Sequence, residues 1–253
     1  MPAAHFLIRT PDIVRVALIT GATAGMGREI ARQLASKGLK VVIGARVGGR
    51  GRALADELRA AGGDAVSVPL DVADPDSVAA AAAWADGEIG RLDVLINNAG
   101  IARDLHKKPT ETTLQDFRET YETNVFGAAM VTNAFLPMLL KSDDGRIINQ
   151  SAALGSHSMT ALMQPPLVKL NWLAYNSSKA ALNAITLEYA KLLRDTSVRV
   201  FATSPGQVST ALNGDRPGGA TPAEGAGVAV RLATIEVPPP NGSFWGLSGQ
   251  LPW

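Results

Sequence analysis

The sequence predicts a single α/β domain over residues 1–253, a doubly wound parallel sheet with helices on both faces. Two observations predict it. Short apolar runs without polar alternation recur along the chain, as is typical of strands that are buried on both faces. Segments with helical spacing separate these runs, and this alternation implies a parallel sheet with right-handed crossovers. No repeat, linker or second core interrupts the pattern.

We expect seven strands, at residues 14–20, 40–45, 65–70, 92–97, 146–151, 198–203 and 242–247. Helices are expected at residues 27–37, 50–61, 112–140, 173–193 and 221–234, and one begins after residue 74. Asp74-Pro75 opens that helix, because aspartate suits the N-cap and proline the first turn. Thr221-Pro222 begins the last helix, and a bend is expected near Gly127 in the long one.

The composition excludes several classes of function. The net charge is +1 with 19% charged residues, which argues against a nucleic-acid surface. The absence of cysteine excludes disulfides and thiolate chemistry, and the three scattered histidines show no metal-ligand spacing. No apolar stretch is long enough to span a bilayer, and residues 1–13, an N-terminal extension, show no signal-peptide pattern. We therefore expect a cytoplasmic protein without metal, nucleic-acid or membrane partners.

A glycine-rich turn follows the first predicted strand, with the spacing Gly21-x3-Gly25-x-Gly27. Between a strand and a helix, such a turn lets backbone N–H groups approach a pyrophosphate, and the helix N-terminus adds favourable partial charge. The second strand ends in Ala45-Arg46, where an acidic residue would favour NAD. A guanidinium instead suits the 2′-phosphate of NADPH (NADP⁺). Asp71-Val72, after the third strand, is a candidate for the adenine edge.

Tyr175 and Lys179 lie four residues apart in a predicted helix and therefore share one face. An ammonium near a phenol lowers the cost of ionising it, from an ordinary pKa of about 10. A positioned donor with a pKa nearer neutrality is a better general acid or base. The pair therefore indicates proton transfer by a tyrosine.

Together these motifs identify a resemblance to the short-chain dehydrogenase/reductase family, and to its NADPH-dependent carbonyl reductases, from about Val14 onward. The resemblance implies a seven-stranded Rossmann sheet. It assigns the dinucleotide to Gly21, Thr23, Ala24, Met26, Asn98, Ala99, Gly100, Pro205, Gly206 and Val208. Among these, Pro205, Gly206 and Val208 would hold the nicotinamide end. The expected cofactor site also includes Gly25, Gly27, Arg46, Asp71, Val72, Tyr175, Lys179 and Thr210.

The resemblance also implies four catalytic roles. Tyr175 would donate a proton to the carbonyl oxygen, and Lys179 would bind the nicotinamide ribose and lower the tyrosine pKa. Asn124 would hold a water that links Lys179 to solvent. A serine after the fifth strand would polarise the carbonyl. We expect an NADPH-dependent reductase of an apolar ketone or aldehyde (reversibly an alcohol dehydrogenase); the alternative is a non-catalytic NADP(H)-binding regulator.

The serine departs from the family pattern, because Asn149-Gln150-Ser151-Ala152 places alanine at the expected position. Three interpretations remain open. Ser151 serves through a local bulge, and it is our candidate; or Ser156 or Ser158 replaces it; or Ala152 is a substitution that disables the enzyme, at a cost of about 10²–10³ in rate.

Two segments are expected near the substrate. Residues 153–172 form an insertion at the mouth of the active site, which would wall an apolar pocket or cover a surface that relatives use to oligomerise. Residues 210–220, rich in Gly, Asn and Asp, suggest a lid. The sequence leaves open whether the protein is a monomer or a homo-oligomer.

Overall fold

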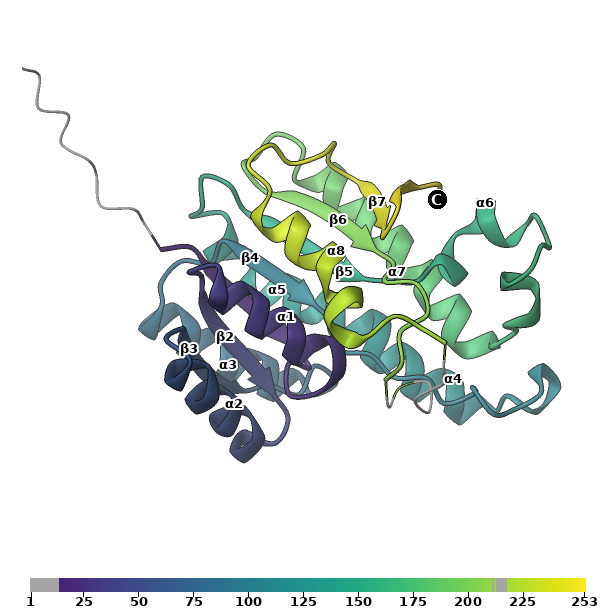
Figure 1. The fold of residues 1–253 in the computed structure, drawn as a ribbon, viewed down its shortest axis with the longest axis horizontal. Helices are drawn as coiled ribbons and strands as arrows, with labels where there is room; N and C mark the ends of the chain where they lie inside the picture. The colour runs from purple at the N-terminus through teal and green to yellow at the C-terminus, as the bar shows by residue number, and fades with distance from the viewer. Residues whose placement is uncertain (1–13, 211, 213–217) are drawn as a thin grey trace, which may run out of the picture.

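An open, twisted sheet runs through the molecule with helices packed on both sides (Figure 1). The computed structural model describes residues 14–210, 212 and 218–253. The predicted N-terminal extension, residues 1–13, lies outside the described residues, as do 211 and 213–217 of the predicted lid. Over the described ranges, no helix is long and apolar enough to cross a membrane.

Eight strands form one sheet in the order β3-β2-β1-β4-β5-β6-β7-β8. Their bounds are β1 Val16–Thr20, β2 Lys40–Ala45, β3 Asp64–Pro69, β4 Val94–Asn97, β5 Arg146–Gln150, β6 Arg199–Thr203, β7 Ser243–Gly246 and β8 Gly249–Leu251. The first seven are parallel, as predicted. The strand order reverses direction between β1 and β4, and open α/β sheets bind ligands at the carboxyl ends of strands at such a point.

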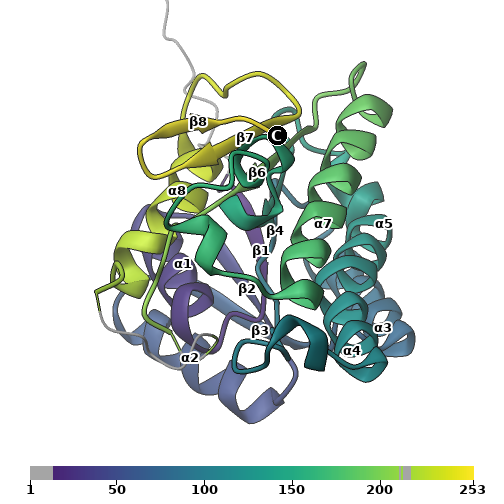
Figure 2. The same cartoon turned by 90° about the vertical axis from the view of Figure 1, so that its right-hand side faces the viewer.

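The helices divide between the two faces of the sheet (Figure 2). One face carries α1 Gly25–Ser36, α2 Gly48–Ala60 and α8 Pro222–Thr234, and the other carries α3 Pro75–Glu88, α4 Leu114–Tyr121, α5 Ala128–Leu139 and α7 Leu173–Leu192. Each layer encloses its own apolar core against the sheet. The predicted doubly wound architecture is therefore confirmed.

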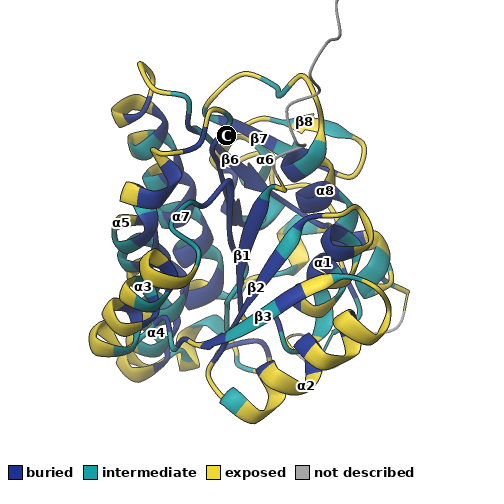
Figure 3. Ribbon diagram, turned by 90° about the vertical axis from the view of Figure 1, so that its left-hand side faces the viewer, coloured by how far each residue is buried: buried dark blue, intermediate teal, exposed yellow. Residues whose placement is uncertain are grey.

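The uninterrupted apolar sequences of the strands are explained by the burial of both faces of the sheet. All five residues of β1 are buried, and the central strands are dark in Figure 3, whereas the outer surfaces of the helices are exposed. Ile19 packs into the core under α1 and α8, and its neighbour Leu18 packs into the opposite core. Successive side chains point to opposite faces, so neither position tolerates a polar residue.

The predicted helix starts are confirmed at both proline motifs. The Asp74 carboxylate accepts a hydrogen bond from the Asp76 N–H at 3.0 Å at the start of α3. Thr221 caps α8, and the Glu224 carboxylate in turn accepts a hydrogen bond from the Thr221 N–H at 2.7 Å. Each cap satisfies N–H groups that have no partner within the helix.

The structure refines two predictions of secondary structure. The helix expected over residues 112–140 is helical without a break from Leu114 to Leu139, but the π-helix η2 (Glu122–Gly127) lies between α4 and α5 and ends where a bend was expected. The seven-stranded sheet has an eighth strand, β8, which pairs antiparallel with β7. That strand has only three residues and begins with a glycine, so its local sequence carries no strand pattern and only the hairpin with β7 defines it.

Candidate active site

A cleft of about 300 Å³ opens beside the carboxyl ends of β4, β5 and β6. Half of the predicted site residues line it: Met26, Asn98, Gly100, Ser151, Tyr175, Lys179, Pro205, Gly206, Val208 and Thr210. Segments far apart in the sequence thus meet where a parallel sheet is expected to bind a ligand. The other predicted residues, which do not line the cleft, are Gly21, Thr23, Ala24, Gly25, Gly27, Arg46, Asp71, Val72, Ala99 and Asn124.

Tyr175 and Lys179 occupy the first two turns of α7 and face the cleft together. Both are buried, with 9% and 4% of their surface exposed. The Lys179 ammonium lies 5.6 Å from the centre of the tyrosine ring and donates to the Gln150 carbonyl oxygen at 2.7 Å. The shared helix face predicted from the spacing is therefore present.

Burial shifts the pKa of both groups in the direction that favours their neutral forms. It raises the pKa of Tyr175 to about 12 and lowers the pKa of Lys179 to about 8. The tyrosine pKa is thus raised, not lowered as expected, because burial removes the phenol from water. Near neutral pH Tyr175 keeps its proton, as a proton donor must, and most of Lys179 is charged.

The first turn of α7 is fixed from outside the helix. Trp172 precedes it without a side-chain cap, and the Asp104 carboxylate accepts a hydrogen bond from the Ala174 N–H at 2.7 Å instead. The Trp172 ring packs edge-on against the Tyr175 ring, at 6.1 Å between centres. These contacts hold the tyrosine in a defined position at the cleft wall.

Asn124 lies in the π-helix η2 and is 1% exposed. Its side chain accepts from the Ile101 N–H at 2.8 Å, and donates to the Ile101 carbonyl at 2.9 Å and to the Ser178 hydroxyl at 3.0 Å. It therefore ties the loop after β4 to α7, next to Lys179. π-Helical turns are frequent at functional sites. The predicted role in holding a water stays a prediction.

The serine predicted to polarise the carbonyl does not offer its hydroxyl to the cleft. Ser151 lines the cleft, but its Oγ lies 2.6 Å from the Asn183 carboxamide oxygen and 3.3 Å from the Lys179 carbonyl, both on α7. Ser156 is fully buried and donates to the Pro252 carbonyl. Neither Ser156 nor Ser158 lines the cleft, whereas Ala152 does.

Ser204 is a lining residue that the sequence reasoning missed. It follows β6 directly and is 3% exposed, and its hydroxyl oxygen accepts a hydrogen bond from the Ala153 N–H at 2.9 Å. Its position immediately before the predicted nicotinamide residues Pro205 and Gly206 was the available signal. Nothing in the local sequence shows that this hydroxyl reaches the end of β5.

The glycine-rich turn has the geometry that close approach of a phosphate requires. Gly21 and Gly25 have positive φ angles of 62° and 51°, and a Cβ on Gly27 would lie 2.4 Å from the Gly21 carbonyl oxygen. Helix α1 starts at Gly25 without a side-chain cap, so no capping side chain accepts hydrogen bonds from its first N–H groups. Asn98 anchors the turn, donating to the Thr20 carbonyl at 2.9 Å.

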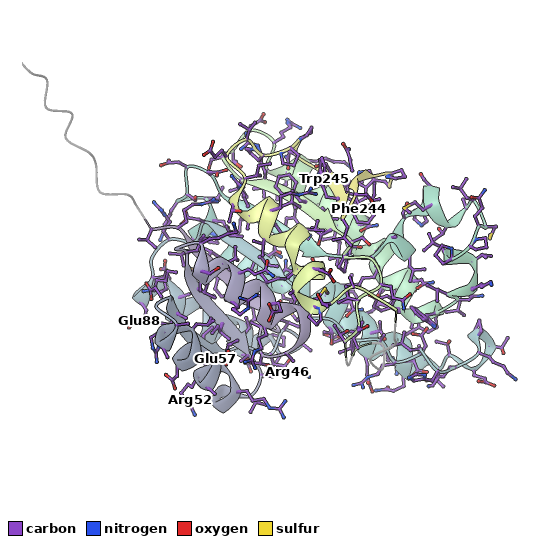
Figure 4. The ribbon with its side chains drawn as sticks, viewed as in Figure 1. Arg46, Arg52, Glu57, Glu88, Phe244 and Trp245 are labelled. Atoms are coloured by element: carbon purple, nitrogen blue, oxygen red, sulfur yellow. The ribbon has the colours of Figure 1, made fainter. Side chains whose placement is uncertain are left out.

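The predicted adenosine end lies beyond the carboxyl ends of β2 and β3. Arg46 is exposed, and Figure 4 shows it on the same side of the molecule as Arg52, beside α2. Within the described ranges, no carboxylate lies within ion-pair distance of the Arg46 guanidinium. Asp71 accepts from the Ala73 N–H at 3.1 Å, and Val72 is buried beside it.

The predicted insertion walls part of the cleft, as proposed from its apolar residues. Pro166, Leu167, Leu170 and Trp172 line the cleft, whereas Leu162 and Met163 do not and are 63% and 72% exposed. The chain end secures this segment, because the Ser158 N–H donates to the Trp253 carbonyl at 2.9 Å. Phe244 stacks on Trp253 at 5.2 Å, outside the cleft lining.

No group of three His, Asp or Glu side chains that could hold a metal occurs in the part of the chain that the structure describes. The polar groups that line the mostly apolar cleft include the Tyr175 phenol, the Lys179 amine, hydroxyls and amides.

Comparison with known proteins identifies the family. The short chain dehydrogenase family model matches residues 15–219. A short-chain dehydrogenase, anuI, of Penicillium roqueforti is 35% identical over 225 residues, covering 86% of this chain and 87% of that protein. The (+)-neomenthol dehydrogenase of Arabidopsis thaliana is 32% identical, covering 91% and 95%. The NADPH-bound carbonyl reductase from chicken fatty liver superposes with a TM-score of 0.82 at 32% identity, covering 95% and 99%.

The chain therefore belongs to the short-chain dehydrogenase/reductase family. It is an NAD(P)-dependent oxidoreductase that acts on carbonyl and CH–OH groups.

Proposed function

We propose that the protein is an NADPH-dependent reductase of apolar ketones or aldehydes, which also oxidises the corresponding secondary alcohols. The observation that carries the proposal is the buried Tyr175–Lys179 pair at the wall of an apolar cleft. Leu105, Leu154, Leu167, Leu170 and Trp172 line that cleft. Such a surface favours a bulky apolar substrate with one carbonyl group. The Arabidopsis relative is named for a cyclic, largely apolar alcohol, which agrees with this class.

The residues present fit a dinucleotide. The positive φ of Gly21 and Gly25 suits a tight turn beside a pyrophosphate, and the absence of a side chain at Gly27 lets α1 pack closely against that turn. The uncapped start of α1 supplies N–H donors. Arg46, exposed and without a carboxylate partner in the described structure, would pair with a 2′-phosphate, and we infer a preference for NADPH over NADH from it.

When bound, the reduced nicotinamide supplies the hydride for the carbonyl carbon. Tyr175 gives its phenolic proton to the carbonyl oxygen, which becomes the alcohol hydroxyl. Lys179, held by the Gln150 carbonyl, places a positive charge beside the phenolate that forms and so lowers the barrier to its formation. The apolar walls exclude water and strengthen this interaction.

The test is reduction of a panel of cyclic and linear ketones, followed by loss of the absorbance of reduced nicotinamide, with NADPH and NADH in parallel. Tyr175→Phe is expected to lose about 10²–10⁴ in turnover and to keep its affinity for NADPH. Unchanged turnover in that variant would refute the mechanism. Activity with NADH alone would refute the assignment of Arg46.

A second function is favoured by one observation, the alanine at position 152. In this alternative the protein binds NADP(H) and regulates a partner without turnover, or catalyses poorly. A wild-type protein that binds NADPH but reduces no ketone would support it. The cytoplasmic location stays a prediction, as does the choice between monomer and homo-oligomer.

A further inference from the structure

We propose that Ser204 is the catalytic residue that hydrogen-bonds the substrate carbonyl oxygen, in the role that the family pattern gives to a serine at position 152. The inference rests on the ketone reduction proposed above. It assigns no new covalent step. The hydride comes from the reduced nicotinamide, the proton comes from Tyr175, and Ser204 keeps its own hydrogen while polarising the C=O bond.

The ends of β5 and β6 place this hydroxyl beside the alanine. The two segments run side by side past the sheet, because the Ser151 N–H donates to the Thr203 carbonyl at 2.8 Å. One step further along, the Ser204 Oγ accepts from the Ala153 N–H at 2.9 Å. The oxygen is therefore within hydrogen-bond distance of the residue that directly follows Ala152. A hydroxyl from β6 thus approaches the place where the pattern expects one from β5.

The hydrogen of this hydroxyl is available to a ligand. Ser204 Oγ accepts one hydrogen bond, and among the residues that the structure describes it donates none. The side chain is 3% exposed and lines the cleft together with Tyr175 and Ala152. A buried donor without an acceptor is unfavourable, so a carbonyl oxygen that enters the cleft would complete the site. The hydrogen bond that Ser204 Oγ accepts from the Ala153 N–H also polarises the serine O–H group and makes it a better donor.

Ser151 cannot fill this role in the observed arrangement. Its single hydroxyl hydrogen is directed to α7, where the Asn183 oxygen lies at 2.6 Å. To reach the cleft it would have to break that buried bond and leave the carboxamide oxygen without its donor. The Ser204 hydroxyl, in the described structure, donates no hydrogen bond that would have to be broken.

The experiment compares wild type, Ser204→Ala, Ala152→Ser and the double variant as NADPH-dependent ketone reductases. Ser204→Ala is expected to lower kcat by about 10²–10³-fold and to leave the NADPH dissociation constant unchanged. Ala152→Ser alone is expected to change kcat little, because the donor is already present. In the double variant, the serine at 152 is expected to restore most of the lost turnover, which a merely structural role of Ser204 would not allow.

An electronic readout separates polarisation from packing. Across para-substituted acetophenones, the loss caused by Ser204→Ala is expected to grow as the carbonyl becomes less electrophilic, whereas a distorted site would slow all of them alike. Ser142→Ala is the matched control, since that buried hydroxyl also accepts a backbone N–H, from Asp144 at 3.3 Å, and does not line the cleft. Its turnover at temperatures below unfolding is expected to match wild type.

The outcomes distinguish this inference from the proposed function. Full turnover in Ser204→Ala, or a gain of about 10²-fold or more in Ala152→Ser alone, overturns the assignment of Ser204 and leaves ketone reduction standing. A wild type that binds NADPH but reduces no member of the panel overturns the proposed function and this inference with it.

Discussion

The pH dependence of the two reaction directions follows from the burial of Tyr175 and Lys179. Burial raises the tyrosine pKa from 10.0 to about 12, which adds about 3 kcal/mol to the cost of forming phenolate. At pH 8 the phenolate fraction of such a group is about 10⁻⁴, against about 10⁻² for an ordinary tyrosine. Reduction needs the neutral phenol and alcohol oxidation needs the phenolate. Oxidation is therefore expected to start from a low rate at neutral pH and to rise with pH.

The titration of Lys179 affects the other reaction direction, carbonyl reduction. The Lys179 ammonium has a pKa lowered to about 8, so it is charged below that pH and loses its charge above it. Reduction is expected to be constant below about pH 7 and to decline above about pH 8, because the forming phenolate then loses its stabilising charge.

Initial rates of both directions, measured between about pH 6 and pH 10 at constant ionic strength and saturating coenzyme, test this expectation. In Lys179→Met the decline of reduction near pH 8 is expected to disappear, together with most of the activity. An oxidation rate that is already constant from pH 7 upward would show a phenol with a pKa near neutrality. That result would refute the argument that burial dominates at this site.

Three further predictions follow from single positions. Arg46→Ala is expected to raise KM for NADPH by about tenfold or more and to leave KM for NADH unchanged, whereas Arg52→Ala leaves both unchanged; equal effects on the two coenzymes would contradict the assignment. Lys179→Met is expected to raise the free energy of unfolding by about 1–3 kcal/mol below pH 8, where the folded state buries an ammonium. The gain should shrink as pH rises from about 8 toward the unfolded value of 10.5, and urea unfolding measures it; a destabilised variant would contradict it. Gly27→Ala is expected to cost about 1–3 kcal/mol and coenzyme affinity, because its Cβ would meet a carbonyl oxygen at 2.4 Å. Gly87→Ala, in α3 with nothing within 4 Å, should instead stabilise by about 0.5–1 kcal/mol in thermal unfolding.

The strand and helix order was predictable because both patterns are local. The last helix begins and ends at the predicted residues, since Thr221-Pro222 is a complete start signal. The π-helix was not predictable, because its apolar spacing is the same as that of a helix. The π-helix contains Asn124, whose side chain hydrogen-bonds to Ile101 and Ser178, and these partners lie 23 and 54 residues away in the sequence.

The candidate site was predictable in its motifs but not in the direction of its hydroxyl groups. Tyr175 and Lys179 share a face because four residues make about one helical turn, and any long helix brings them together. Ser151 was expected to face the cleft only through a bulge. Its hydroxyl instead meets Asn183, 32 residues further along the chain. Ser204 reaches the end of β5 only because β6 pairs with β5.

The sequence by itself determined the alternating fold, the family, the glycine-rich turn and the tyrosine–lysine pair, because short-range periodicity and spacing encode them. The tertiary structure decided which hydroxyl faces the cleft, what burial does to the two pKa values, and which part of the insertion forms the wall. These properties depend on desolvation and on contacts between residues distant in the chain. Local sequence does not encode either of them.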